Sequence, residues 1–254
     1  MTRERPAPAP GPDLTGQVAI VTGATRGIGA AISRSLLEAG AAVHAIYARD
    51  EEAATRFCDG LGPLAERVSL HALDVAEPTA VESLFAALPA PPQILVNNAG
   101  IRQDALVGLT SLASWERVLA VNLTGAFHLC KLAVRAMLGA RYGRIVSLTS
   151  PSGHLGLAGQ GSYAASKAGL TALSRCLALE VATRGITVNC VCPGLVETDL
   201  VSGLPAERLA ELTAQIPLRR AARPEEIASA VLYLVSPAAS YVTGTTLFVT
   251  GGLG

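Results

Sequence analysis

Short runs of β-branched and other apolar residues alternate along this chain with segments of helical length. We predict strands at 17–22, 42–47, 67–72, 93–97, 143–149, 186–191 and 246–250, and helices at 28–39, 51–60, 78–88, 111–138, 162–183 and 224–235. Several runs are almost entirely apolar, which is typical of strands covered on both faces. Strands that alternate with helices pair in parallel through right-handed crossovers. The sequence therefore predicts an α/β fold, a doubly wound parallel sheet of about seven strands with helices on both faces.

The predicted sheet fits within one domain. The 254 residues lie near the upper size of a single hydrophobic core, and neither an internal repeat nor a linker divides them. Residues 1–12 are rich in proline and alanine, and we expect them to form a flexible tail. The domain then spans residues 13–254, and we expect the segment 195–216 to be a mobile lid over the substrate.

Charge and hydropathy narrow the classes of partner. The net charge is zero at neutral pH, so we predict no basic surface for nucleic acid or for an anionic membrane. No uninterrupted apolar stretch reaches the roughly 18–20 residues of a membrane-spanning helix. The first residues also lack the apolar core of a secretion signal. We therefore expect a cytoplasmic protein that binds neither nucleic acid nor a membrane.

The five cysteines, an odd number, are typical of a reducing compartment. Cys190 and Cys192 have the spacing of a metal-binding pair, but they lie in an extended apolar run. Structural zinc requires four ligands, and no second cluster accompanies this pair. We interpret both as buried thiols that pack like small apolar side chains, and we expect no bound metal.

The first predicted strand runs directly into a glycine-rich turn. Residues 22–29 are Thr-Gly-Ala-Thr-Arg-Gly-Ile-Gly, and a helical segment follows. Glycines let the backbone approach a pyrophosphate, while a helix N-terminus offers free N–H groups and the positive end of the helix dipole. We interpret the turn as part of a dinucleotide site that includes Gly23, Thr25, Arg26, Ile28 and Gly29. The alternative is a turn that only reverses the chain.

The second predicted strand ends without the acidic residue that NAD-specific sheets place there. Arg49 follows this strand, and Asp50 comes only after it. Arg26 and Arg49 are suited to pair with a 2′-phosphate, so we predict NADP(H) as the cofactor. The alternative leaves Arg49 in solvent and makes Asp50 the cap of the next helix.

Tyr163 and Lys167 are spaced by one helical turn, so their side chains can face the same cleft. A phenol titrates near pH 10, and a neighbouring ammonium is expected to lower its pKa toward the working pH of an acid catalyst. A lysine four residues after a tyrosine is also a common arrangement on a solvated helix face. Lysine is rare in this chain, where it occurs only at 131 and 167. This rarity favours a position at which an arginine would not fit.

Three further polar groups follow or interrupt predicted elements. Ser150 ends the strand 143–149, at the edge where a doubly wound sheet binds its ligand. Asn122 lies among apolar residues in the helix 111–138, and a buried amide needs a partner. Residues 97–100, Asn-Asn-Ala-Gly, follow the fourth strand and are expected to form a wall of the cofactor site. The alternatives are a turn serine at Ser150 and a bond from Asn122 to a neighbouring carbonyl.

Taken together and in order, these motifs resemble the short-chain dehydrogenase/reductases over residues 14–254. The resemblance implies a Rossmann-like enzyme that moves hydride between NADP(H) and a carbonyl or an alcohol. It implies that Tyr163 protonates the carbonyl oxygen, Lys167 binds the nicotinamide ribose, Ser150 orients the substrate and Asn122 holds a relay water. The cofactor contacts that it implies are Asp74 and Val75 at the adenine, Asn98 at the ribose with Gly100 in the same wall, and Val196 and Thr198 at the nicotinamide amide.

Within that family, the segments 184–189, 224–228 and 243–244 resemble 3-oxoacyl-(acyl-carrier-protein) reductases. This resemblance implies reduction of a 3-oxoacyl thioester, carried by acyl carrier protein, in fatty-acid or polyketide-type synthesis. It also implies that Arg141 and Arg184 flank the cleft and contact the acidic carrier. The alternative is that both arginines are ordinary solvated charges. Pro151 departs from the pattern, because a proline pushes the preceding Ser150 toward an extended conformation.

Two rival functions stay open: a dehydrogenase of a small free alcohol, sugar or steroid, and a catalytically silent regulator that binds a nucleotide. The segments 111–138 and 162–183 contain more apolar residues than one buried face needs. Contact between subunits would cover the surplus, and the family resemblance suggests a homotetramer.

Overall fold

The computed structural model describes residues 11–198, 203 and 205–253. Seven strands form one sheet in the order β3-β2-β1-β4-β5-β6-β7, and each neighbouring pair is parallel. The strands are β1 (Val18–Thr22), β2 (Ala42–Tyr47), β3 (Val68–Ala72), β4 (Ile94–Asn97), β5 (Gly143–Leu148), β6 (Ile186–Pro193) and β7 (Thr246–Val249). The predicted doubly wound parallel sheet is confirmed, with each strand boundary within two residues of its expected place.

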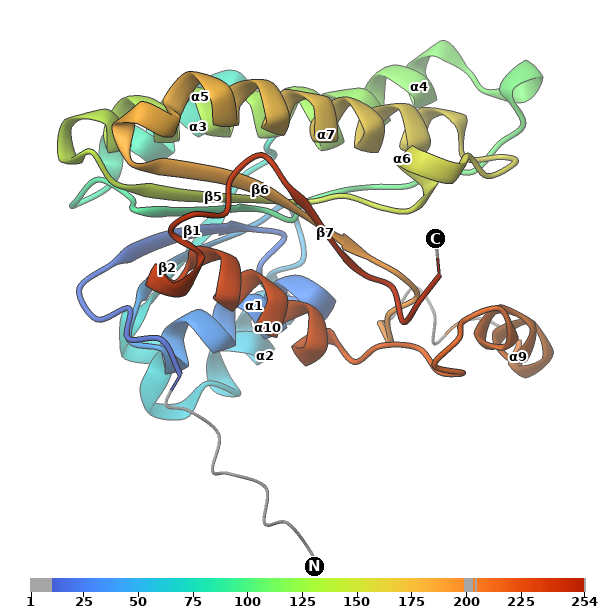
Figure 1. Ribbon diagram of the computed structural model, residues 1–254, viewed down its shortest axis with the longest axis horizontal. Coiled ribbons are helices and arrows are strands. Elements are labelled where there is room, and N and C mark those ends of the chain that lie inside the picture. The colour runs from blue at the N-terminus through green and yellow to red at the C-terminus, as the bar shows by residue number, and fades with distance from the viewer. Residues whose placement is uncertain (1–10, 199–202, 204, 254) are drawn as a thin grey trace, which may run out of the picture.

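Helices cover both faces of the sheet (Figure 1). Helices α1 and α10 lie on one face with α2 beside them, and α3, α5 and α7 lie on the other. The helices are α1 (Gly27–Glu38), α2 (Glu51–Asp59), α3 (Pro78–Ala87), α4 (Leu112–Leu119), α5 (Gly125–Ala140), α6 (Ser152–Leu155), α7 (Gly161–Val181), α9 (Ala206–Ala214) and α10 (Pro224–Val235). The short α6 and the helix α9 were not expected from the sequence.

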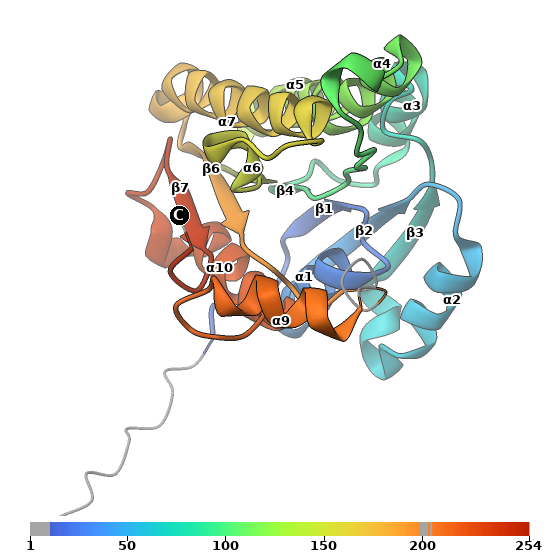
Figure 2. The ribbon, with the colours of Figure 1, turned by 90° about the vertical axis from the view of Figure 1, so that its right-hand side faces the viewer.

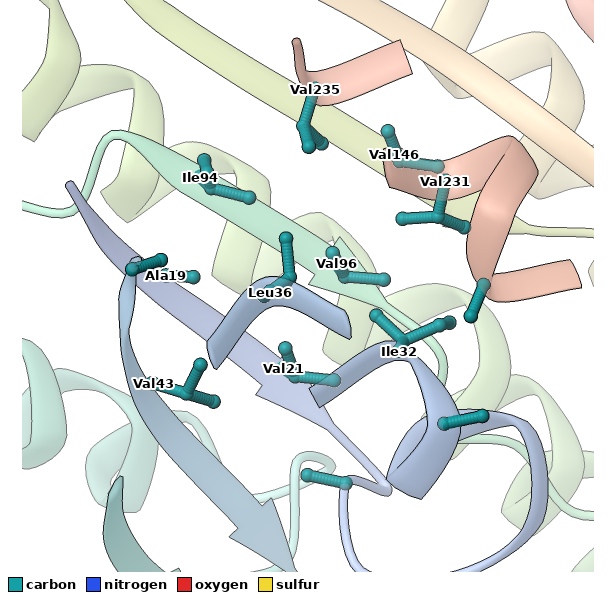
Figure 3. Packing of buried hydrophobic residues seen from close by; sticks show 14 of the residues in the cluster. Ala19, Val21, Ile32, Leu36, Val43, Ile94, Val96, Val146, Val231 and Val235 are labelled. Atoms are coloured by element: carbon teal, nitrogen blue, oxygen red, sulfur yellow. The ribbon is translucent and has the colours of Figure 1, made fainter. Parts of the chain in front are cut away.

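One hydrophobic core lies on each face of the sheet. On the α1 and α10 face, Ile32 and Leu36 of α1 meet Val231 of α10 over the valines of β1 and β4 (Figure 3). The second core joins the opposite faces of the same strands to α3, α5 and α7, with Leu129 and Met137 fully buried in it. Because both faces are covered, the strands need the apolar runs from which they were predicted.

The helix predicted at 111–138 consists of three pieces. Helix α4 ends at Leu119, a π-helical turn spans Ala120–Thr124, and α5 continues from Gly125. The whole stretch Leu112–Ala140 is the one helical segment of the described chain that is long and apolar enough to cross a membrane by length and composition alone. Its inward side packs against α3 and the sheet, so its apolar residues are accounted for by the second core.

The topology opens a crevice at the carboxyl edge of the sheet. The chain leaves β1 for α1 on one face, whereas it leaves the adjacent β4 for α4 and α5 on the other. Strand connections that diverge in this way create the place where doubly wound proteins bind ligands. In Figure 2, α9 lies on the same side of this edge as α1 and α10, across from α4 and α6.

Two predicted segments lie partly outside the described residues. Of the expected tail 1–12, residues 1–10 are not described, and of the expected lid 195–216, residues 199–202 and 204 are not described. The rest of the lid segment contains Val196, which bridges to Ala222, and the helix α9. The tail and the lid therefore stay predictions.

Candidate active site

The glycine-rich turn joins β1 to α1. Gly23 has a φ of +60°, in the left-handed region that favours glycine. At Gly29 a Cβ atom would lie 1.9 Å from the Gly23 carbonyl oxygen, so only glycine lets the turn close on the first turn of the helix. Arg26 occupies the N-cap position of α1, and its side chain makes no capping bond to the helix. The backbone N–H groups at this helix start are thus free for a phosphate.

Asn98 connects the ends of the two strands that flank the crevice. Its side-chain amide donates to the carbonyl oxygens of Thr22 and Gly23 at 2.9 and 3.0 Å. In return, the backbone N–H groups of Asn98 and Ala99 donate to the Thr22 hydroxyl. Asn98 therefore holds the β1 turn against the end of β4, and this role was not foreseen beside its expected contact with the cofactor.

A cavity of about 460 Å³ runs from this turn across the ends of β2, β3 and β4 to α4. Its lining includes eight of the residues expected to bind cofactor, namely Gly23, Thr25, Arg26, Arg49, Asp74, Val75, Asn98 and Gly100. Six others do not line it, namely Ile28, Gly29, Tyr163, Lys167, Val196 and Thr198. Thr198 nevertheless approaches the phosphate-binding turn, because a Cβ on Gly27 would lie 3.2 Å from its methyl group. Val196 is buried.

Arg117 is a cavity residue that the sequence analysis missed. It forms an ion pair with Asp74. Burial alone would raise the pKa of the Asp74 carboxyl, but bonds from the Ala76 N–H and from Arg117 hold it below its usual range. A charged Asp74 is thus fixed at the end of the cavity between β3 and α4. The available signal was helical spacing, since Arg117 and Val121 are four residues apart and both line the cavity.

The rim of the cavity near β2 contains opposite charges. Arg26 pairs with Asp50 at 3.1 Å, and both side chains are substantially exposed. The Asp50 carboxylate also accepts a hydrogen bond from the Ala53 N–H and caps α2, as its alternative interpretation predicted. Arg26 and Arg49 thus both lie at the rim, as a contact with a 2′-phosphate requires.

Tyr163 and Lys167 lie in the first two turns of α7, and Lys167 is only 3% exposed. Its ammonium donates to the Leu148 carbonyl oxygen at the end of β5, at 2.7 Å, and lies 5.7 Å from the centre of the Tyr163 ring. No carboxylate pairs with it in the described part of the chain. Burial lowers the pKa of Lys167 to about 8. The alternative of a solvated surface lysine is wrong.

The expected effect of Lys167 on the phenol is not found. Burial raises the pKa of Tyr163 above its ordinary value, and the opposing influences are a hydrogen bond with Ser150 and the charge of Arg102. Lys167 is not among the groups that shift it. The physical reason is that burial disfavours the charged phenolate more than the nearby hydrogen bond and positive charge favour it. A raised pKa keeps the phenol protonated at neutral pH, which is the state of a proton donor.

Asn122 lies in the π-helical turn, where the chain changes its helical register. Its amide oxygen accepts from the Ile101 N–H at 2.8 Å, and its amide nitrogen donates to the Ile101 carbonyl and to the Ser166 hydroxyl. The alternative, a bond to a neighbouring carbonyl, is therefore realised. Gly100 lies close to both Asn122 and Lys167, because a Cβ there would lie 3.4 Å from the Lys167 nitrogen and 3.5 Å from the Asn122 oxygen.

Arg141 and Arg184 do not lie beside this cleft. Each precedes its strand, Arg141 before β5 and Arg184 before β6, whereas Ser150 and Pro193 lie at the other ends of these strands. Because the strands are parallel, both arginines lie at the amino edge of the sheet, opposite Ser150. The side chain of Arg141 bonds to the Thr183 carbonyl. The expectation that they flank the cleft of the same subunit is thus wrong.

Comparisons with known proteins agree with this geometry. A family model described as enoyl-(acyl carrier protein) reductase matches residues 23–254. The chain is 43% identical over 244 residues to the 3-oxoacyl-(acyl-carrier-protein) reductase FabG of Vibrio cholerae, which covers 95% of this chain and 98% of the relative. It is equally 43% identical to nodulation protein G of Rhizobium sp. strain N33, over 95% and 98% of the two chains.

A solved structure described as a putative gluconate dehydrogenase from Agrobacterium tumefaciens superposes with a TM-score of 0.91 at 32% identity, over 95% of this chain and 97% of the other. The glycine turn that a Cβ would block and the cavity beside it fit a dinucleotide, and relatives in this family use NAD(P). The chain is an oxidoreductase, and it belongs to the short-chain dehydrogenase/reductase family.

Proposed function

We propose that this enzyme reduces a 3-oxoacyl thioester, carried by acyl carrier protein, to the 3-hydroxyacyl form with NADPH, in fatty-acid or polyketide-type synthesis. Relatives named as 3-oxoacyl-(acyl-carrier-protein) reductases match nearly the whole chain at 43% and 44% identity, among them that of Salmonella typhimurium. We also propose that it works in the cytoplasm.

The bound cofactor supplies the hydride. Tyr163 then donates its proton to the carbonyl oxygen, since its raised pKa keeps the phenol protonated at neutral pH. Ser150, within hydrogen-bonding reach of Tyr163, offers a second hydroxyl to the same oxygen. Lys167 places a buried cation at the end of β5, 5.7 Å from the centre of the Tyr163 ring, and we propose that it would bind the nicotinamide ribose of the cofactor. Asn122 holds the loop after β4 against α7 through Ile101 and Ser166, and we propose that it also holds the relay water.

Two exposed apolar segments near Tyr163 favour an acyl substrate over a sugar. The first segment contains Leu106, Val107 and Leu109, which are 61%, 79% and 78% exposed, and the second contains Leu155 and Leu157, which are 60% and 53% exposed. A β-bridge between Ala105 and Gln160 joins the two segments, and Gln160 lies three residues before Tyr163. Exposed apolar side chains gathered at a cleft suit a hydrocarbon chain better than a polyol. This observation supports the proposed substrate most directly.

The experiment is a substrate panel with the purified enzyme and NADPH. We expect consumption of NADPH with acetoacetyl thioesters, on acyl carrier protein or coenzyme A. Crotonyl thioester tests the C=C reduction that the name of the family model suggests. Gluconate with NADP⁺ tests the activity named for the structural neighbour. Turnover of gluconate without turnover of acetoacetyl thioesters would overturn the proposal in favour of a free-alcohol dehydrogenase.

We also propose that the protein is a homotetramer. The outer sides of α4, α5 and α7 expose Trp115, Phe127, Leu138 and Leu179. Neighbouring subunits would cover these side chains. Since Arg141 and Arg184 lie at the edge away from their own cleft, we propose that they contact the carrier at a neighbour's cleft. Sedimentation as a monomer would contradict the assembly. Loss of carrier-bound but not coenzyme-A-bound turnover on reversing both charges would support the contact.

A further inference from the structure

Ser150 is the first member of a chain of hydrogen bonds that no step above uses. Two residues later, at the start of α6, Ser152 is only 5% exposed. Its backbone N–H donates to the Ser150 hydroxyl oxygen at 3.3 Å, and the two hydroxyl oxygens are also 3.3 Å apart. The Ser152 hydroxyl donates in turn to the side-chain oxygen of Gln160 at 2.7 Å. The chain therefore runs from Ser150 through Ser152 to Gln160.

The chemistry of these groups sets the direction of every proton in the chain. An amide oxygen only accepts, so the single proton of Ser152 points to Gln160. The Ser152 oxygen can then only accept from Ser150, and the Ser150 proton points to Ser152. The Ser150 oxygen then has one lone pair that neither Ser152 nor Gln160 uses. Bond lengths agree with the order, since the bond to Gln160 is short and the bond from Ser150 is long.

Gln160 is itself held in place by the backbone around it. Its N–H donates to the Leu157 carbonyl, and its own carbonyl accepts from the Ala164 N–H at 2.7 Å, at the start of α7. The neighbouring Gly159 carbonyl accepts from the Ala105 N–H at 2.9 Å. The end of the chain is thus anchored both to the helix of Tyr163 and to the loop that follows β4.

We propose that Ser152 and Gln160 are positioning residues that set the rotamer of Ser150 for carbonyl binding. The proposal rests on the proposed function, because it assumes that Ser150 donates to a carbonyl oxygen. When the substrate enters, the Ser150 hydroxyl exchanges its long bond to Ser152 for a bond to that oxygen. The Ser152 N–H stays bonded to the Ser150 oxygen, so the oxygen keeps its place and only the hydroxyl proton changes direction. Without the Ser152 hydroxyl, the Ser150 side chain keeps only the Ser152 N–H as a partner in this chain of bonds and samples other rotamers, so fewer encounters are productive.

The test compares variants of the full-length enzyme with NADPH and acetoacetyl thioester. We expect Ser152→Ala to lower kcat about tenfold while the KM for NADPH and the melting temperature stay unchanged. Ser152→Thr keeps the hydroxyl and should restore kcat to within about twofold of the wild type. Gln160→Leu should match Ser152→Ala, whereas Gln160→Glu keeps the accepting oxygen and should retain activity at neutral pH. Loss of activity in Gln160→Glu would contradict the proton direction inferred here.

The most decisive measurement asks whether the effect of Ser152→Ala on kcat depends on Ser150. In the Ser150→Ala background, Ser152→Ala should have no further effect, because the two residues act through one hydroxyl. A purely structural role of Ser152 would instead lower kcat by the same factor in both backgrounds, and this result would overturn the proposal. Ser114→Ala is a matched control, because Ser114 donates to the side-chain oxygen of Gln103 in the same way but on α4.

The two proposals fail in different ways. If the wild type reduces no 3-oxoacyl thioester, the proposed function is wrong. If the wild type reduces the thioester and Ser152→Ala has the same kcat as the wild type, only the positioning role is wrong.

Discussion

The carboxyl edge of the sheet has two halves that are built differently. In the catalytic half, at the ends of β5 and β6 and the start of α7, polar side chains are buried and bonded to one another or to the backbone, as Lys167 is to Leu148. In the dinucleotide half, at the ends of β1 to β4, an open cavity begins at the glycine-rich turn and has charges such as Arg26 and Asp50 on its rim. Burial thus controls the chemistry of the first half, while backbone shape controls the second.

This difference predicts how each half responds to substitution. A buried polar group that loses its partner costs the full desolvation of that group, whereas an exposed ion pair contributes little. We therefore expect large effects from side chains in the catalytic half. In the dinucleotide half we expect large effects from glycines and small ones from charges.

The largest effect is expected at Lys167. Lys167→Ala should lower kcat by about 10²–10⁴-fold, the range of a group that assists proton transfer. Lys167→Arg should not restore it, because a guanidinium fork does not fit where one ammonium donates to the Leu148 carbonyl. Steady-state kinetics measures both. Lys131→Ala, at the exposed second lysine, is the control. A wild-type kcat in Lys167→Ala would contradict the expectation that side chains in the catalytic half have large effects.

In the dinucleotide half, the next largest effect is expected at Gly29. Its added methyl would lie 1.9 Å from the Gly23 carbonyl, so Gly29→Ala forces the phosphate-binding turn to open. We expect NADPH binding to weaken by up to about a hundredfold, which corresponds to an overpacking cost of about 1–3 kcal/mol. Fluorescence titration measures the affinity. Gly139→Ala in α5 meets no atom within 4 Å and should leave binding and melting temperature unchanged or raise the latter.

A third effect, about tenfold, is expected from pH. Because burial lowers the pKa of Lys167 to about 8, its ammonium is present below pH 8 and is lost as the pH rises through that value. The rate of carbonyl reduction should therefore fall by about tenfold between pH 7 and pH 9. NADPH binding at the open half should change much less over this range. A flat rate profile up to pH 10 would show that the charge of Lys167 is not needed.

The smallest effect is expected from the exposed charge on the rim. Arg26→Ala should raise the KM for NADPH about fivefold, as expected for an exposed charge pair worth about 1 kcal/mol, and leave the KM for NADH unchanged. Arg56→Ala removes another exposed arginine in an ion pair, away from the cavity, and serves as the control. Equal effects on both cofactors would contradict a contact with the 2′-phosphate.

Much of the catalytic half was predictable because its residues follow strong local rules. The i, i+4 spacing located Tyr163 and Lys167 on one helix, and the end of β5 located Ser150. The pKa of Tyr163 was predicted in the wrong direction, because spacing reveals a neighbouring charge but not the depth of burial. Ser152 and Gln160 were missed for a similar reason, since their bond depends on how the loop around α6 folds.

The position of Arg141 and Arg184 was predictable in principle. Both precede predicted strands, and in a parallel sheet every strand starts at the same edge, away from the ligand. The family resemblance, by contrast, implied a position beside the cleft. The spacing of Arg117 and Val121 indicates a shared helix face, but it does not reveal the pairing with Asp74, which joins α4 to the end of β3 across the crevice.

The measurement that most directly tests this account is turnover by Tyr163→Phe with NADPH and acetoacetyl thioester. The variant removes only the phenol hydroxyl, which makes no hydrogen bond to a described side chain outside the site. We predict that kcat falls by about 10²–10⁴-fold while the fluorescence-measured affinity for NADPH stays that of the wild type. An unchanged kcat would contradict the assignment of Tyr163 as the proton donor.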